Sequence, residues 1–282
     1  MKKNSFDLSD RIDPGLLEVA EVLIQVTDPL SIPFFLIGAA CRDLILDTIY
    51  GINTIRATND IDFAICISDW DQFVKLKKEL ILSEMFEETR LTHRLIFKSE
   101  LLIDLVPFGS ITGRDKKFSW PSEPGLIMNT IGFEEAYEHS IPIIIRSNPP
   151  LKIQIASLAG LVVTKLFSWK DKYPNRARDA QDIILIVKEY TYAGNDMRMF
   201  NEAPDLVEKG DFDYELAGAR LLGRDIGAFI DNKTKNEILK ILEVETGDQQ
   251  QYPLIEQMNA EIAFEHKLKM IEELKAGIKD SI

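Results

Sequence analysis

Cysteine and histidine are scarce in this chain. Its only two cysteines, Cys41 and Cys66, fall inside expected regular elements, so we expect buried thiols rather than a disulfide. Three histidines make Ser-His-Asp catalysis an unlikely chemistry. The sequence also lacks the motifs of a phosphate loop, a zinc protease, a serine hydrolase elbow and a dinucleotide site.

Long apolar runs are missing as well. The longest, residues 31–41, is broken by Pro33 and Gly38 and is well short of the roughly 20 residues that span a bilayer. Acidic residues follow Lys2 and Lys3 where a signal peptide would have its apolar core. We therefore expect a cytoplasmic protein without membrane partners.

Basic charge is in deficit. The chain has 33 Lys and Arg against 46 Asp and Glu, a net charge of -13. This balance argues against a general nucleic-acid scaffold, because non-specific affinity for DNA or RNA comes largely from Lys and Arg that neutralise phosphates. A local basic groove stays open, since one segment concentrates basic residues: Lys165, Lys170, Lys172, Arg176 and Arg178.

The order of expected elements predicts an α+β protein. With 282 residues and 45% hydrophobic content, the chain can form two domains. Its pattern changes near Pro149-Pro150, so we expect a mixed β-sheet domain with flanking helices over residues 1–148 and an all-helical domain over residues 149–282. Apolar periodicity predicts strands at 60–67, 94–98 and 101–106, and helices at 70–82, 157–169, 176–190, 214–230, 233–243 and 253–278.

Two aspartates one residue apart, Asp60 and Asp62, carry the strongest functional signal. On a strand both carboxylates project to one face, while Ile61 and Phe63 turn to the buried side. A third, Asp104, lies in an otherwise apolar strand, where an isolated charge is costly unless paired. If this strand pairs antiparallel beside the first, the three carboxylates converge at a sheet edge, as two magnesium ions that bridge triphosphate and acceptor require. The alternative is a surface strand with three solvated aspartates.

Small residues at a strand-to-helix turn precede these aspartates. Gly38 and Ala39 would let backbone amides approach a phosphate at the positive end of the helix that follows. Close helix packing is the other explanation for small residues here. Arg42 could bind phosphates or an acceptor, or form a structural salt bridge with Asp43. Arg56, in the following loop, is a further candidate for binding the acceptor.

The turn, the Asp-x-Asp strand and the third strand aspartate together resemble the DNA polymerase β nucleotidyltransferase superfamily. Gly38-Ala39-Ala40-Cys41-Arg42-Asp43-Leu44 is similar to the opening motif of tRNA CCA-adding enzymes and poly(A) polymerases, but the helical half has no counterpart of their Glu-Asp-x-x-Arg motif. The AbiEii-type nucleotidyltransferases, toxins of bacterial toxin–antitoxin systems, place a Lys on one helix and Arg/Lys-Asp-x-x-Asp on the next. Residues 161–170 and Arg178-Asp179-Ala180-Gln181-Asp182-Ile183 match that order, so the resemblance, over roughly 34–190, is closest to this branch.

The resemblance implies a site with two Mg²⁺ ions, which Mn²⁺ could replace, and a nucleoside triphosphate as substrate. Asp60 and Asp62 would hold the metals, and Asp104 would bind the second metal and orient or deprotonate the attacking hydroxyl. Lys165 would contact the phosphates, while Asp182, or less plausibly Asp179, would hold Lys165 or the acceptor. Gly38, Ala39 and Arg42 complete the expected nucleotide-binding set.

The same resemblance assigns catalysis to residues 1–148 and completion of the nucleotide and acceptor cleft to residues 149–282. The acceptor would be a tRNA end, a protein or a small molecule, and an antitoxin protein would be a partner. A non-catalytic relative that keeps the fold as a binding module is the alternative. On the bare sequence, Lys165 would be an ordinary solvated helix residue and Asp179 a charge in the first helical turn, while Asp182 is open between a functional and a surface residue.

Overall fold

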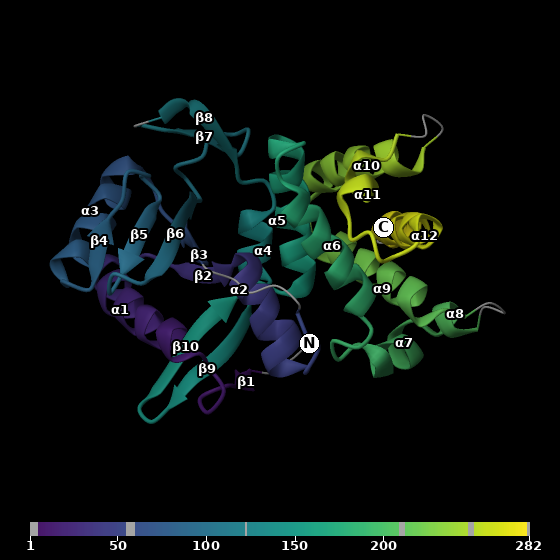
Figure 1. Cartoon of the computed structure of the whole chain (residues 1–282), viewed down its shortest axis with the longest axis horizontal. Helices are drawn as coiled ribbons and strands as arrows, with labels where there is room; N and C mark the ends of the chain where they lie inside the picture. Colours follow the sequence, from purple (N-terminus) through teal and green to yellow (C-terminus); the bar gives the residue numbers. More distant parts are fainter. Residues whose placement is uncertain (1–4, 55–59, 122, 209–211, 248–250, 281–282) are drawn as a thin grey trace. The chain divides into compact units, whose positions relative to one another are not determined.

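The computed structural model describes residues 5–54, 60–121, 123–208, 212–247 and 251–280 (Figure 1). Their contacts divide the chain into two compact units, Met1–Ser157 and Leu158–Ile282. The expected boundary at residue 148 falls inside a β-hairpin of unit 1, because the chain adds one more strand to the sheet before the helices begin.

Unit 1 is built on a mixed β-sheet. Among the described residues, eight strands form it in the order β1-β9-β10-β2-β3-β6-β5-β4, and β7 and β8 pair separately. The strands are β1 (Phe6–Asp7), β2 (Phe34–Ile37), β3 (Asp60–Cys66), β4 (Phe86–Glu88), β5 (Arg94–Phe97), β6 (Leu101–Phe108), β7 (Lys117–Trp120), β8 (Glu123–Asn129), β9 (Ile141–Ser147) and β10 (Pro150–Ile155). The helices are α1 (Pro14–Leu30), α2 (Gly38–Asp43) with a π-helical turn (Leu44–Ile49), α3 (Trp70–Leu82) and α4 (Phe133–Glu138).

Helices α1 and α3 pack against each other and bury one apolar face each. Capping fixes where they begin: the carboxylate of Asp13 accepts a hydrogen bond from the amide of Leu16, and that of Asp69 accepts one from the amide of Gln72, both at 2.9 Å. The predicted helix over 70–82 is confirmed residue for residue.

The direction of β6 differs from the expectation. Strands β3 and β6 pair in parallel, not antiparallel, and they lie inside the sheet between β2 and β5 rather than at its edge. The cause is the connection: α3 carries the chain back along the sheet, so β4 starts in the direction of β3, and the two hairpins β4–β5 and β5–β6 restore that direction in β6.

Unit 2 is helical throughout the described residues. Its helices are α5 (Leu158–Lys172), α6 (Ala177–Glu189), α7 (Asp196–Glu202), α8 (Pro204–Val207), α9 (Tyr214–Phe229), α10 (Asn232–Thr246), α11 (Pro253–Gln257) and α12 (Phe264–Asp280). The single helix expected over 253–278 is wrong. Met258 is extended, and the side chain of Asn259 accepts from the amide of Glu261 at 2.9 Å, a local turn that separates α11 from α12.

Glycines set the closest helix contact of unit 2. A methyl group on Gly223 of α9 would lie 2.8 Å from Cα of Gly277 in α12, and one on Gly277 would overlap the carbonyl oxygen of Arg220. The backbones of α9 and α12 therefore touch at this crossing, which only residues without a side chain permit.

A buried carboxyl links α10 to α11. Glu245 is fully buried and accepts hydrogen bonds from the amides of Leu254 at 3.0 Å and Ile255 at 3.2 Å. Burial outweighs these bonds and raises the pKa of Glu245 to about 7. In the part of the chain that the structure describes, no helix is both long and apolar enough to span a membrane.

Candidate active site

The carboxylates of Asp60, Asp62 and Asp104 come from neighbouring parallel strands. In the β3–β6 register Asp62 lies directly opposite Asp104, and Asp60 is two residues before Asp62 on the same face. The alternate residues Ile61 and Phe63 are buried, as expected. Unit 1 thus gathers the three predicted aspartates on one face of its sheet, through a parallel pairing instead of the antiparallel one anticipated.

Arg94 joins this cluster, although it is not among the predicted site residues. It lies opposite Asp104 in the β5–β6 hairpin, where its Nε donates to Oδ1 and its Nη2 to Oδ2 of Asp104, both at 2.6 Å. Nη2 also reaches Oδ2 of Asp60 at 3.3 Å. The expected strands, 94–98 and 101–106, would have placed Leu105 opposite Arg94. The observed turn spans residues 98–100, one residue more, and brings Asp104 to that position.

The guanidinium of Arg94 interacts electrostatically with all three carboxylates. The hydrogen bond to Asp104 raises the pKa of Arg94 above its usual value, burial opposes this, and the charges of Asp104, Asp60 and Asp62 add to the rise.

This donor set suits a hard divalent cation by its chemistry, because Mg²⁺ prefers carboxylate oxygens. Within the described ranges, however, no group of three or more Asp, Glu, His or Cys side chains is arranged to hold a metal ion. The contacts of Arg94 give a physical reason, since it engages both oxygens of Asp104. The carboxylates therefore suit the cation by their donor type and charge. In the structure described, however, Arg94 occupies both oxygens of Asp104.

Gly38 lies in close contact with the side chain of Asp62. It has a φ of +72°, and a methyl group on it would overlap Oδ2 of Asp62 and lie 2.8 Å from Cγ. The glycine at this turn is thus required by the carboxylate as well as by the backbone. Ala39 follows as the second residue of α2, half-buried. Their phosphate-binding role stays a prediction.

Arg42 forms the salt bridge that was one of its two alternatives. Its side chain is 2% exposed, and its Nε and Nη2 donate to Oδ1 of Asp43 at 2.9 and 2.6 Å. Binding of nucleotide by Arg42 stays a prediction. Arg56 lies outside the described residues.

Unit 2 contains a second charged cluster, around Lys165. The Nζ of Lys165 donates to Oδ2 of Asp182 at 2.5 Å and lies 3.4 Å from Oδ1 of Asp179. All three residues are buried, so neither the solvated lysine nor the surface aspartate of the bare sequence exists. Arg176 lies 3.5 Å from the other oxygen of Asp179. A lysine held by two buried carboxylates is fixed in position, with its charge compensated.

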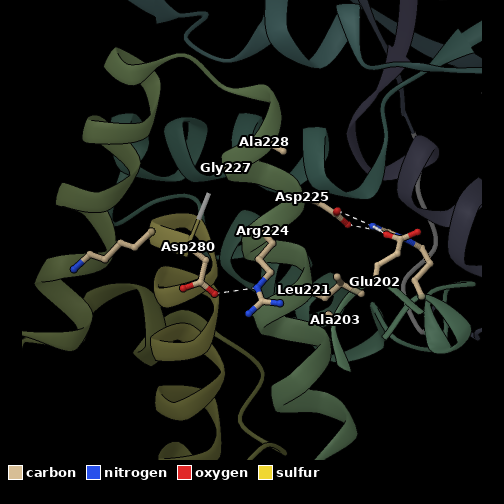
Figure 2. A pocket seen from close by; sticks show the side chains of 10 residues that line it. Glu202, Ala203, Leu221, Arg224, Asp225, Gly227, Ala228 and Asp280 are labelled. Atoms are coloured by element: carbon tan, nitrogen blue, oxygen red, sulfur yellow. Dashed lines mark hydrogen bonds and ion pairs between the residues drawn. The ribbon is translucent and has the colours of Figure 1, made fainter. Parts of the chain in front are cut away.

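A pocket of about 930 Å³ in unit 2 is lined by α7, α9 and the end of α12 (Figure 2). Ion pairs line it: Arg198 donates to both oxygens of Asp225 at 2.8 Å, and Arg224 donates to Asp280 at 2.9 Å. None of the predicted site residues lines it.

A mixed sheet that presents three aspartates from adjoining strands is the arrangement that the resemblance to nucleotidyltransferases led us to expect. Residues 22–252 match the family described as nucleotidyl transferase AbiEii toxin, type IV TA system. The chain belongs to this family of nucleotidyltransferases. The resemblance drawn from the motifs is confirmed, and the match extends beyond residues 34–190.

Distant similarity to solved structures accompanies this result. An antigenic nucleotidyltransferase-like protein from Paracoccidioides brasiliensis is 20% identical, over 68% of this chain and 90% of that one, with a TM-score of 0.39. The antibiotic-resistance factor ANT(2'')-Ia is 10% identical, over 69% and 97%, with a TM-score of 0.35. A Thermotoga maritima CCA-adding enzyme is 16% identical, over 97% and 83%, with a TM-score of 0.29. No curated protein shows significant similarity to the chain.

Proposed function

We propose that this protein is an active, divalent-metal-dependent enzyme that transfers a nucleoside monophosphate from a nucleoside triphosphate to an acceptor hydroxyl. The observation that carries the proposal is the gathering of Asp60, Asp62 and Asp104 on one sheet face, with Asp62 fitted against Gly38. A protein that only binds partners has no need of three clustered carboxylates, whose repulsion costs stability.

The proposed reaction is an in-line displacement. The acceptor oxygen forms a bond to the α-phosphorus, the bond from that phosphorus to the oxygen that bridges it to the β-phosphate breaks, and pyrophosphate leaves. Asp60 and Asp62 would hold Mg²⁺, and Asp104 would ligate the second ion and take the acceptor's proton. Bound metal would neutralise the phosphate charge and lower the pKa of the acceptor hydroxyl.

The buried cluster of unit 2 supplies the proposed phosphate contact. Lys165 binds the phosphates as a point charge, and Asp182 holds its ammonium group in place. Gly38 and Ala39 present backbone amides to the nucleotide, and Arg42 supports them from its buried pairing with Asp43. In this proposal the helical unit thus contributes to nucleotide binding.

The acceptor decides what the activity does in the cell. Its candidates are a tRNA end, a protein and a small molecule. The family description further supports the proposal that the chain is the toxin of a type IV system, with an antitoxin protein as its counterpart.

Label transfer tests the proposal. The protein is incubated with each α-labelled nucleoside triphosphate, Mg²⁺ and either total bacterial tRNA, a protein extract or a panel of small hydroxyl compounds, beside Asp60→Asn/Asp62→Asn. Label on tRNA, on protein or on a small molecule identifies the acceptor class, and it should vanish in the double variant. If no label moves and triphosphate with Mg²⁺ or Mn²⁺ does not raise the melting temperature, the non-catalytic alternative holds.

A further inference from the structure

The guanidinium of Arg94 lies where a cation of the active site would be expected. It approaches Asp104 side-on through two nitrogens, both at 2.6 Å, and the same Nη2 extends to Asp60. The Arg94 side chain is 25% exposed, and that of Asp104 is 12% exposed, so solvent screens this pairing only in part. Parallel, bidentate bonds of this kind are the strongest that arginine and a carboxylate form.

The same oxygens are those a metal needs. A carboxylate has about four lone-pair sites. The two nitrogens of Arg94 occupy one site on each oxygen of Asp104, and these are the sites that a metal ion bound by both oxygens would use. A doubly charged ion ligated by Asp104 would also repel the guanidinium held against it. Arg94 and a divalent cation therefore compete for Asp104 and, more weakly, for Asp60.

We propose that Arg94 is a positioning residue that holds Asp104 as an internal counter-cation, and that divalent metal binds in full only when Arg94 releases Asp104. This inference rests on the proposed function, because it concerns the same three aspartates. It adds a residue outside the predicted site set, and it explains why carboxylates that suit a cation in chemistry do not form a metal-holding group in the described conformation.

Release of Arg94 would free both oxygens of Asp104 for the ion. The triphosphate offers the released guanidinium new bidentate oxygen partners.

Metal binding without substrate tests the inference. The affinity for Mn²⁺ is measured by electron paramagnetic resonance of the free ion with wild-type protein, Arg94→Gln, Arg94→Lys and Arg90→Gln. We expect Arg94→Gln to bind Mn²⁺ about tenfold more tightly, since it loses the competing charge-assisted pair. Arg94→Lys keeps a charge but not the fork, so its affinity should lie between the two. The exposed Arg90 controls for net charge and should have no effect.

The outcomes separate this inference from the proposed function. Mn²⁺ affinity in Arg94→Gln equal to or weaker than wild type, with binding abolished by Asp60→Asn, overturns the role of Arg94 and leaves the metal site standing. Absence of Mn²⁺ binding in every variant overturns the role of Arg94, while label transfer decides on the proposed function. Far-UV circular dichroism confirms that each variant is folded; if Arg94→Gln unfolds, Arg94→Lys decides by the same criterion.

Discussion

Replacing Gly38 with alanine tests how closely the turn is fitted to the catalytic carboxylate. The new methyl group would overlap Oδ2 of Asp62, and its backbone has a φ of +72°, in the left-handed region. The methyl cannot be accommodated unless Asp62 moves. We therefore expect the variant to lose metal binding and transfer activity by more than its stability loss explains.

The magnitude has two parts. A residue with a side chain in the left-handed region costs roughly 1–2 kcal/mol of folding stability. Displacing a metal-ligating side chain through its neighbour typically costs about 10–100-fold in metal affinity or activity. The loss of folding stability affects the whole protein, whereas the loss of metal affinity and activity is confined to the aspartate site.

Gly51 offers a matched control. It also has a φ of +72°, but among the described residues no atom would lie within 4 Å of a methyl group on it. Gly51→Ala should therefore lose stability in urea denaturation and retain Mn²⁺ affinity and label transfer, while Gly38→Ala loses all three. Wild-type Mn²⁺ affinity in Gly38→Ala, or an equal loss of activity in Gly51→Ala, would refute the reasoning.

Three further predictions concern unit 2. The pKa of Glu245 rises from 4.5 to about 7 on folding, so the stability that Glu245 contributes should be fully present below pH 4.5 and fall by about 3 kcal/mol as pH rises to 7. In urea denaturation at pH 5 and 8, Glu245→Gln should lack most of this change. Gly277→Ala should cost about 1–3 kcal/mol in calorimetry, because its methyl overlaps the backbone of α9. Lys165→Met should cost about 3–5 kcal/mol in urea denaturation by leaving buried carboxylates uncompensated, and Lys165→Met/Asp182→Asn should recover part of it.

Each of these has a control of the same chemistry. The exposed Glu272→Gln should keep the pH dependence that Glu245→Gln removes. Gly125→Ala adds a methyl into open space and should leave the melting temperature unchanged. The exposed Lys170→Met should have little effect on stability. A control that behaves like its partner variant would contradict the corresponding explanation.

Local patterns predicted the elements better than their pairing. The two-residue period of Asp60 and Asp62 and the apolar stripe of α3 depend only on nearby residues, so both could be predicted from sequence. The direction of β6 could not, because an apolar strand reads the same in either sense and the hairpins that reverse it lie between. Strand β10 was missed because Pro150, read as the start of a helical domain, stands at the first position of a strand, where proline is tolerated.

The site residues divide in the same way. The motifs indicated Asp104 and Lys165. The burial of Lys165, however, depends on packing between helices that are separate in the sequence, so local patterns could not predict it. Sequence reasoning could not place Arg94 opposite Asp104, because the expected strands 94–98 and 101–106 pair it with Leu105, and the observed turn is one residue longer. The importance of Arg94 emerges only from the fork geometry of the guanidinium.

The interior position of β3 and β6 has a kinetic consequence. Each strand is hydrogen-bonded on both sides, so the backbones that carry the aspartates cannot shift without breaking two ladders. Rearrangement of the cluster is thereby left to side-chain rotation, above all of Arg94. Rotamer changes of partly exposed side chains take place in picoseconds to nanoseconds, whereas collective backbone motions take microseconds to milliseconds. Cation entry into this site should therefore be limited by encounter and dehydration of the ion rather than by a slow conformational step.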